Sequence, residues 1–245
     1  MEREVVIEVK NLYKKFGNFV ANDNLSFKVY KGEIYGFLGA NGAGKTTAMK
    51  ILCGISLPTS GEVTIAHLDF NKYREKIKLK IGYMSQKFSL YDDLTVKENF
   101  RFFGGIYRMS RAQIKEATVR LLESLDMMSL MDTIVGSLPV GWKQKLAFTI
   151  ANMHSPEIVF LDEPTGGVDP LTRRRFWELI YQAANNGVTV FVTTHYMDEA
   201  EYCNRLCIMN DGKIIVENSP KELKTIYNAS NMDEVFLKIV NRKHS

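Results

Sequence analysis

A glycine-rich loop near the N-terminus constrains this chain more than any other feature. It reads Gly39, Ala40, Asn41, Gly42, Ala43, Gly44, Lys45, Thr46. The apolar run 34–38 precedes the loop, and a helix-compatible stretch, 47–52, follows it. Backbone N–H groups at a helix start bind the concentrated charge of a phosphate, and glycine lets that backbone come close. The strand, loop and helix together predict a nucleotide site rather than an ordinary turn.

Two side chains of the loop indicate how the phosphates are held. In this pattern Lys45 reaches the β- and γ-phosphates, and the hydroxyl of Thr46 is a ligand of Mg²⁺. The backbone from Gly42 to Thr47 adds further N–H donors to the phosphates. We therefore expect residues 39–47 to bind a nucleotide together with Mg²⁺.

Length and composition fit a globular chain with one large domain, or a core and a subdomain. Of the 245 residues, 45% are hydrophobic and 24% are charged, and the net charge of +4 selects no class of partner. The three cysteines are too few for a disulfide framework, which indicates a reducing, cytosolic setting. Cys203 and Cys207 have the spacing of one helical face, where buried thiols are expected rather than a metal site. No run approaches about 18 apolar residues, so we expect a soluble chain whose membrane role needs a partner.

Hydrophobic patterning divides the chain into a mixed α/β core and a helical insertion. Strands are expected at 5–10, 25–30, 34–38, 62–66, 81–84, 158–161, 188–192, 206–209 and 214–216, with turns at 17–18, 22–24 and 58–61. Helices are expected in the insertion at 95–107, 110–127 and 142–153, and elsewhere at 171–186, 220–227 and 232–240. Strands that alternate with helices predict a mostly parallel sheet whose ligand lies at the carboxyl ends of the strands.

An acidic pair, Asp162 and Glu163, ends the apolar strand 158–161. Carboxylates at that position lie at the edge where a parallel sheet binds its ligand. Asp162 is expected to hold the Mg²⁺ shell, and Glu163 to orient an attacking water or accept its proton. Taken alone, the pair fits two solvated carboxylates equally well. Combined with the phosphate loop, it indicates nucleotide hydrolysis.

The order of the remaining motifs resembles the nucleotide-binding subunit of an ABC transporter over nearly the whole chain. Gln86 follows a strand, as the glutamine of that family's Q-loop does, and opens the helical insertion. Asp169 lies in a stretch that resembles the D-loop, and His195 ends a strand in the manner of the switch histidine. Phe16 stands where relatives stack an aromatic ring on adenine.

The resemblance implies an α/β fold with a P-loop NTPase core of the RecA-like kind, an N-terminal antiparallel β subdomain and an inserted α-helical subdomain. One ABC ATPase domain would span 1–245, with the core and β subdomain at 1–86 and 155–217. The helical subdomain would span 87–154 and contact the membrane subunits, and a short helical tail would span 218–245. ATP and Mg²⁺ are the implied cofactors.

The resemblance also implies how the residues act and which partners they meet. The implied roles are Mg²⁺ binding for Thr46, Gln86 and Asp162, action on water for Glu163, and contact with the γ-phosphate for His195. Two copies would dimerise head to tail, with ATP between the phosphate loop of one copy and Gly141 of the other, and Asp169 would belong to the residues that bind the nucleotide. The implied partners are a second ATP-binding subunit, with a homodimer expected, and an integral membrane permease on a separate chain. We expect a peripheral position at the cytoplasmic face of the membrane and no nucleic acid partner.

The segment that should complete the site in the dimer departs from the family pattern. Relatives begin it with leucine, serine and two glycines, whereas this chain has Leu138, Pro139, Val140 and Gly141. Proline lacks the serine hydroxyl and one backbone N–H, so two donors to the γ-phosphate are missing. We therefore expect the dimer to close more weakly. With its proline, this segment resembles the corresponding segment in the ATPases of multidrug and antibiotic exporters of the ABC-2 type, which implies export.

Other functions stay open at this point. The altered segment also fits an ATP-binding regulatory module with little turnover, although the intact Glu163 and His195 favour an ATPase. A soluble ABC protein of DNA repair or translation would carry a second ATP-binding half or a long coiled-coil insertion, and neither is visible. A GTPase needs an aspartate in its guanine motif, which the stretch 71–74 lacks.

Overall fold

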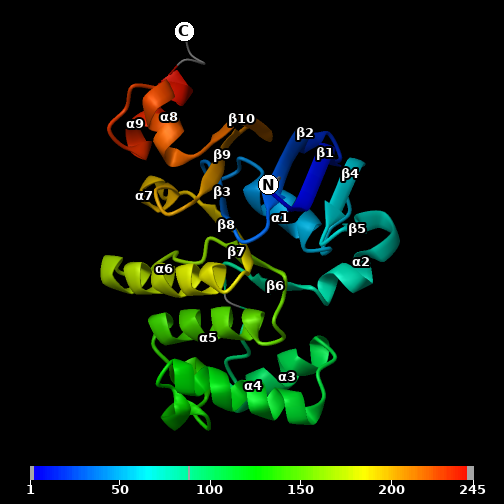
Figure 1. Cartoon of the computed structure of the whole chain (residues 1–245), viewed down its shortest axis with the longest axis vertical. Coiled ribbons are helices and arrows are strands. Elements are labelled where there is room, and N and C mark those ends of the chain that lie inside the picture. The colour runs from blue at the N-terminus through cyan, green and yellow to red at the C-terminus, as the bar shows by residue number, and fades with distance from the viewer. Residues whose placement is uncertain (1–2, 88, 242–245) are drawn as a thin grey trace.

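The computed structural model describes residues 3–87 and 89–241, and over these residues the chain forms two β-sheets surrounded by helices (Figure 1). The larger sheet has the order β10-β9-β3-β8-β7-β6. Its strands are β3 (Ile34–Leu38), β6 (Ile81–Met84), β7 (Ile158–Asp162), β8 (Thr189–Thr194), β9 (Arg205–Asn210) and β10 (Lys213–Asn218). All neighbours pair parallel except β9 and β10. Every residue of β3 and β7 is buried, as expected for central strands covered on both faces.

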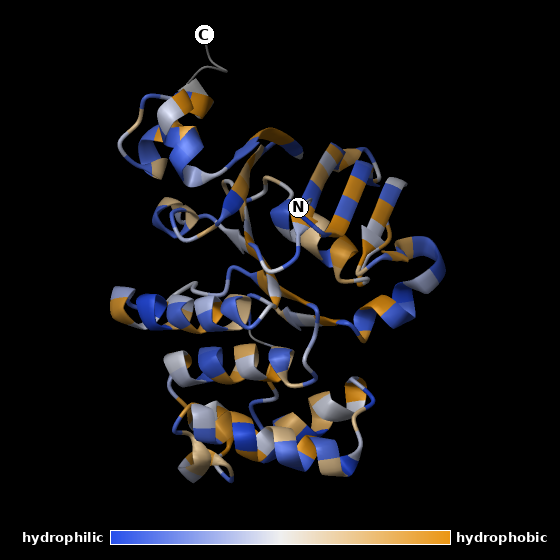
Figure 2. Cartoon of the chain, viewed as in Figure 1, coloured by the Kyte–Doolittle hydropathy of each residue, from blue (hydrophilic) through white to orange (hydrophobic). Residues whose placement is uncertain are grey.

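The smaller sheet is antiparallel and has the order β2-β1-β4-β5. Its strands are β1 (Val5–Phe16), β2 (Phe19–Tyr30), β4 (Ser60–Ile65) and β5 (Leu68–Asp69). Hydrophobic and hydrophilic residues alternate along β1, β2 and β4 in Figure 2, which is the pattern of a sheet with one buried face.

The turn predicted at 22–24 is wrong. These residues lie within β2, where Asn22 pairs with Lys14 of β1. The register of the two strands shifts on either side of Lys14, and Asn24 has a left-handed φ of 57°. Such irregularities let turn-forming polar residues remain in a strand, so the strand continues through them.

Helix α1 (Lys45–Leu52) lies between the two sheets and joins them. Its buried Met49 and Leu52 belong to one hydrophobic cluster with Leu25 of β2 and with Phe37 of β3. The same cluster includes Phe70 at the start of α2 (Phe70–Lys78), a helix that the sequence patterning did not predict. Asp69 caps α2 by accepting a hydrogen bond from the Lys72 N–H, at 2.9 Å. Burial on both sides therefore holds the helix that follows the phosphate loop.

The helical insertion consists of α3 (Val96–Ile106), α4 (Arg111–Ser124) and α5 (Val140–Asn152), with short 3₁₀ turns at η1 (Met128–Leu130) and η2 (Val135–Ser137). Each of the first two helices begins with a capping box, formed by Thr95 with Glu98 and by Ser110 with Gln113. The helices share a hydrophobic cluster of their own, separate from those of the sheets. The three helices predicted in this region are present. The first two are shorter at both ends, whereas α5 begins two residues before the predicted start and ends one residue earlier.

The remaining helices are α6 (Pro170–Asn185), α7 (Met197–Ala200), α8 (Pro220–Ile226) and α9 (Met232–Asn241). The prediction that Cys203 and Cys207 share a helical face is wrong, because Cys203 follows α7 whereas Cys207 lies within β9. The three cysteines are free and buried. The last four positions of the predicted tail 218–245 lie outside the described residues. Within the ranges that the structure describes, no helix has the length and apolar character needed to cross a membrane.

Candidate nucleotide-binding site

The phosphate loop connects the buried strand β3 to α1 and is fixed by its neighbours. Gly44 has φ 98°, and a Cβ there would lie 2.3 Å from the carbonyl oxygen of Ala21. Only glycine combines this left-handed backbone with so close an approach. The Gly44 carbonyl in turn accepts a hydrogen bond of 3.0 Å from Asn22 Nδ2, and Asn22 is completely buried. The loop thus has one defined shape, set partly by the antiparallel sheet.

A pocket of about 440 Å³ opens over this loop. It is lined by Phe19, Ala21, Asn41, Gly42, Ala43, Gly44, Lys45, Thr46, Thr47, Gln86 and Glu163. The predicted loop residues from Asn41 to Thr47 therefore face it together with two of the predicted catalytic residues. Gly39 and Ala40 are not part of the lining, and their carbonyl oxygens point to Lys45.

Lys45 is buried beneath the pocket. Its Nζ donates to the carbonyl oxygens of Gly39, at 2.8 Å, and of Ala40, at 3.1 Å. The carboxylate of Glu163 lies 3.6 Å from the same nitrogen. Burial lowers the pKa of the Lys45 ammonium, and the negative charges of Glu163 and Asp162 oppose that effect. An anion entering the pocket would meet a cation whose burial keeps water from screening it.

Thr46 and Asp162 form an oxygen pair beside the loop. Thr46 Oγ1 donates to Asp162 Oδ1 at 3.1 Å, and Thr193 Oγ1 of β8 donates to the same oxygen at 2.6 Å. A hydroxyl and a carboxylate are the hard oxygen ligands that Mg²⁺ prefers, with phosphate oxygens and water completing its octahedron. The described residues contain no group of three or more His, Cys, Asp or Glu side chains suited to holding a metal on its own. The oxygen atoms of Thr46 and Asp162 therefore fit a metal ion that binds together with a phosphate.

Glu163 is the point where the predicted catalytic residues meet. Gln86 Nε2 donates to its Oε2 at 3.0 Å, and His195 Nδ1 lies 3.1 Å from the same oxygen. The residue has a left-handed φ of 46°, and its N–H is bonded to the carbonyl and the hydroxyl oxygens of Thr193, both at 3.1 Å. This backbone, strained for a residue with a side chain, turns the carboxylate toward the phosphate loop. Three elements, β6, β7 and β8, thus deliver Gln86, Glu163 and His195 to one place.

Three of the predicted residues lie elsewhere. Gly141 and Asp169 line a different pocket of about 410 Å³, which also includes Pro139 and Trp142. Asp169 caps α6 there, accepting from the N–H groups of Leu171 and Thr172 at 3.0 Å. The ring of Phe16 is exposed and lies under the ammonium of Lys14, at 4.7 Å, outside the phosphate-loop pocket.

Sequence reasoning missed three residues that shape the site. Phe19 lines the pocket, Asn22 holds the loop carbonyl, and Thr193 orients both acidic residues. Phe19 is an apolar residue two positions after Gly17, and nothing in its local pattern distinguishes it from a core residue. Asn22 looked like a turn former, and Thr193 like one more β-branched strand residue. Their roles depend on contacts between elements that are far apart in the sequence.

A family model described as "ABC transporter" matches residues 22–166, more than half of the chain. This chain belongs to the ABC transporter family. A second model, described as "AAA domain, putative AbiEii toxin, Type IV TA system", matches the shorter segment 141–197.

Two relatives within the ABC transporter family are named as ATP-binding proteins, one of a multidrug ABC transporter and one of Nod factor export. The chain is 49% identical over 221 residues to the probable multidrug ABC transporter ATP-binding protein YbhF of Escherichia coli (strain K12), covering 90% of this chain and 38% of that protein. It therefore spans well under half the length of this relative. It is 36% identical over 219 residues to the Nod factor export ATP-binding protein I of Cupriavidus metallidurans, covering 89% of this chain and 72% of that protein.

Solved structures confirm the predicted fold class, an α/β P-loop NTPase core with an antiparallel β subdomain and inserted helices. An ATP-binding subunit of an ABC transporter superposes with a TM-score of 0.86 at 24% identity, covering 96% of this chain and 99% of that chain. A dimeric ATP-binding cassette in a post-hydrolysis state with ADP and Pi has a TM-score of 0.79 at 28% identity, covering 87% and 98%.

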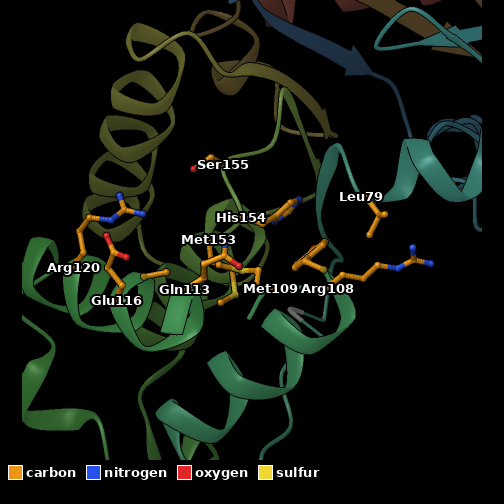
Figure 3. Close-up of a pocket in the computed structure, with 11 residues that line it drawn as sticks. Leu79, Arg108, Met109, Gln113, Glu116, Arg120, Met153, His154 and Ser155 are labelled. Atoms are coloured by element: carbon orange, nitrogen blue, oxygen red, sulfur yellow. The ribbon is translucent and has the colours of Figure 1, made fainter. Parts of the chain in front are cut away.

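A third pocket of this ABC-family chain, about 370 Å³, lies between the core and the helical insertion (Figure 3). His154 stacks on Tyr107 with ring centroids 3.6 Å apart, and its Nε2 lies 3.1 Å from the Ile81 carbonyl oxygen. Burial lowers the pKa of His154 to about 4. In Figure 3 the side chain of Arg108 extends away from Arg120, so the two guanidinium groups do not converge on one point as they would in a phosphate site.

Proposed function

We propose that this chain is the ATP-binding and ATP-hydrolysing subunit of a membrane ABC transporter, and that the transporter is an exporter. The observation that carries the proposal is the position of the Glu163 carboxylate. It lies among Lys45 Nζ, Gln86 Nε2 and His195 Nδ1, at 3.6, 3.0 and 3.1 Å, next to the pair of Thr46 and Asp162. A carboxylate base beside a phosphate loop is the arrangement that hydrolysis of a nucleoside triphosphate requires.

The loop and the oxygen pair bind the substrate. We propose that the N–H groups of 42–47 and the ammonium of Lys45 bind the phosphates of ATP, and that Thr46 and Asp162 hold Mg²⁺, with Gln86 at the edge of its shell. The metal supplies charge neutralisation at the phosphate oxygens. A bound phosphate attracts the Lys45 ammonium, which then gives up its hydrogen bonds to the Gly39 and Ala40 carbonyls. The buried ammonium thus exchanges these partners for the phosphate and is not left without a partner.

Glu163 acts on the attacking water. Its Oε2 is occupied by Gln86 and His195, whereas its Oε1 has only the longer contact to Lys45. We propose that Oε1 accepts the proton of the water and that the other two side chains fix the plane of the carboxylate. His195, half-exposed at the mouth of the site, would also reach the γ-phosphate.

A second copy of the chain completes the site in this proposal. Gly141 and Asp169 share a pocket that is separate from the phosphate loop, so within one chain they do not reach the nucleotide bound there. Head-to-tail pairing would place them opposite the γ-phosphate, and the dimeric cassette among the structural neighbours supports the pairing of two copies. Phe16 would stack on adenine. The division into 1–86 with 155–217, 87–154 and 218–245 stays part of the proposal.

The helical insertion carries the surface proposed for the membrane permease. Tyr91 and Phe102 meet with ring centroids 4.5 Å apart, and both rings are exposed, as is Ile106 on the same helix. The patch of Tyr91, Phe102 and Ile106 follows Gln86 along the chain, and Gln86 contacts Glu163. A partner bound to the patch would therefore act near Glu163. This position, and the export systems named among the relatives, support a peripheral place at the cytoplasmic face of a membrane. An exposed apolar patch such as that of Tyr91, Phe102 and Ile106 is typical of interaction sites.

The test is the rate of phosphate release from ATP by Glu163→Gln. The amide is isosteric but takes up no proton, so we expect at least a hundredfold loss of turnover with unchanged ATP binding. Glu178→Gln, on the exposed face of α6, is the matched control and should keep the wild-type rate. Near-normal turnover in Glu163→Gln would remove its assigned role. A wild-type chain without turnover, alone or with its membrane partner, would favour the regulatory module instead.

A further inference from the structure

A groove of about 310 Å³ lies between α3 and α4 in the helical insertion, the part of the molecule farthest from α8 and α9 in Figure 1. It is lined by Lys97, Arg101, Arg111, Ile114, Lys115, Thr118, Val119 and Met131. None of these residues lines the pocket over the phosphate loop or the pocket that holds Gly141. The nucleotide-binding function proposed above therefore does not involve the groove.

The rim of the groove is positively charged. Lys97 forms a salt bridge with Asp132. Within the ranges 3–87 and 89–241, no carboxylate forms a salt bridge with Arg101, Arg111 or Lys115, and all three side chains are exposed. Three cations without a salt-bridge partner thus surround one apolar depression, although the net charge of the whole chain is only +4.

The four charged side chains of the groove, Lys97, Arg101, Arg111 and Lys115, can only donate hydrogen bonds. Lysine and arginine have no acceptor atom. The buried Thr118 hydroxyl already donates to the Ile114 carbonyl at 2.7 Å, and the Met131 carbonyl already accepts from the Lys97 N–H at 3.0 Å. The floor is aliphatic, formed by Ile114, Val119 and Met131. The complementary ligand has a purely accepting anionic end and a hydrocarbon body.

We propose that this groove binds an anionic phospholipid of a membrane, with an acyl chain in the groove and the phosphate at the cationic rim. A peptide fits less well, because its backbone N–H groups would face a rim of four side chains that can only donate. Inorganic phosphate fits less well, because it leaves the apolar floor uncovered. Cations near an anionic membrane surface each contribute to binding, and buried methylene groups add to it. The contact would fix the helical insertion against the bilayer.

The experiment is flotation of the purified chain with vesicles of phosphatidylcholine, with or without phosphatidylglycerol. Binding is expected only with the anionic lipid. The double variant Arg111→Gln with Lys115→Gln should bind about twenty-five-fold more weakly, at about fivefold for each cation near the surface. The matched control, Lys72→Gln with Lys76→Gln on α2, removes the same charge elsewhere and should bind like the wild type. Equal losses in the two double variants would overturn the proposal, since binding would then follow net charge alone.

A groove-filling variant separates acyl insertion from surface attraction. Val119→Trp keeps all four rim cations and fills the depression, so binding should fall at least fivefold, whereas Ile226→Trp, on exposed α8, should change nothing. Unchanged binding by a folded Val119→Trp would overturn the groove as the site. If that variant does not fold, Arg101→Glu on the exposed rim replaces it and must weaken binding. The assay contains no nucleotide, so its outcome is independent of the proposed ATPase function.

Discussion

Gln86 and Glu163 are 77 positions apart, and the side-chain amide of one donates a 3.0 Å hydrogen bond to the carboxylate of the other. Gln86 stands just after β6, where the chain leaves the core for the helical insertion. Glu163 stands just after β7, the next strand of the sheet. The bond therefore joins the proposed base to the segment that leads toward the exposed aromatic patch of Tyr91 and Phe102. A displacement of that segment would alter the base directly.

Replacement of Gln86 tests this connection. Gln86→Ala removes a donor to an anionic carboxylate, an interaction worth about 1.5 to 3 kcal/mol, so turnover should fall by about ten- to a hundredfold. ATP binding should change little, because Lys45 and the loop backbone remain. Steady-state phosphate release measures the effect, and Gln182→Ala on the exposed surface of α6 is the control. A wild-type rate in Gln86→Ala would show that Glu163 is positioned without it.

Glycine replacement tests the shape of the phosphate loop. Gly44→Ala places a Cβ 2.3 Å from the Ala21 carbonyl oxygen at φ 98°, so the loop must move and nucleotide affinity should fall at least tenfold. Gly187→Ala also has a left-handed φ, 89°, but its added Cβ meets nothing within 4 Å. That control should cost about 1 to 2 kcal/mol of unfolding free energy and leave affinity unchanged. Equal affinities in the two variants would contradict the fixed loop shape.

The N-terminus of α5 supplies a gain-of-function prediction. Pro139 is the N-cap of this helix, at φ −57° and ψ 151°, and it makes no side-chain cap hydrogen bond. Pro139→Ser restores a hydroxyl and an N–H, so turnover should rise by about tenfold if these donors limit closure of the dimer. The free energy of unfolding should rise as well, by about 0.5 to 2 kcal/mol, because serine is a good cap. Pro58→Ser in a surface turn is the control, and a more stable but no faster Pro139→Ser would show that closure is not limiting.

His154 predicts how stability depends on pH. Burial lowers its pKa to about 4 from an ordinary 6.5. As pH falls from about 6.5 to about 4, the unfolded chain binds a proton at this residue that the folded chain does not, so stability decreases over that window. His154→Phe keeps a ring against Tyr107 and removes the titrating group. Urea unfolding at pH 7 and pH 5 should show a smaller loss of stability in His154→Phe than in the wild type or the exposed control His67→Phe. An unchanged loss would mean that His154 is not the residue responsible.

The parts of the molecule that local sequence determines were predictable. The phosphate loop, the acidic end of β7 and the three helices of the insertion each depend on short-range features, namely glycine spacing, an apolar run and helical periodicity. The burial of β3 and β7 followed from their unbroken apolar runs.

The parts that depend on distant contacts were not predictable. The local tendency of Asn22 predicts a turn, whereas its place in β2 is set by pairing with β1 and by its bond to Gly44. Helix α2 is only nine residues long and its backbone is non-helical at Tyr73, so its apolar residues Phe70, Tyr73 and Ile77 form no long periodic run. The left-handed backbone of Glu163 depends on Thr193, a partner on another strand, and no pattern around Glu163 indicates it.

The central claim is that the phosphate loop and the acidic pair hold a single triphosphate with its metal, and calorimetric titration with ATP tests it most directly. With Mg²⁺ present, we expect one site per chain in the wild type and at least tenfold weaker binding in both Lys45→Ala and Asp162→Asn. With the metal chelated, Asp162→Asn should match the wild type, whereas Lys45→Ala should remain weak. Absence of binding by the wild type, or equal affinity for Mg·ATP in all three proteins, would contradict the account.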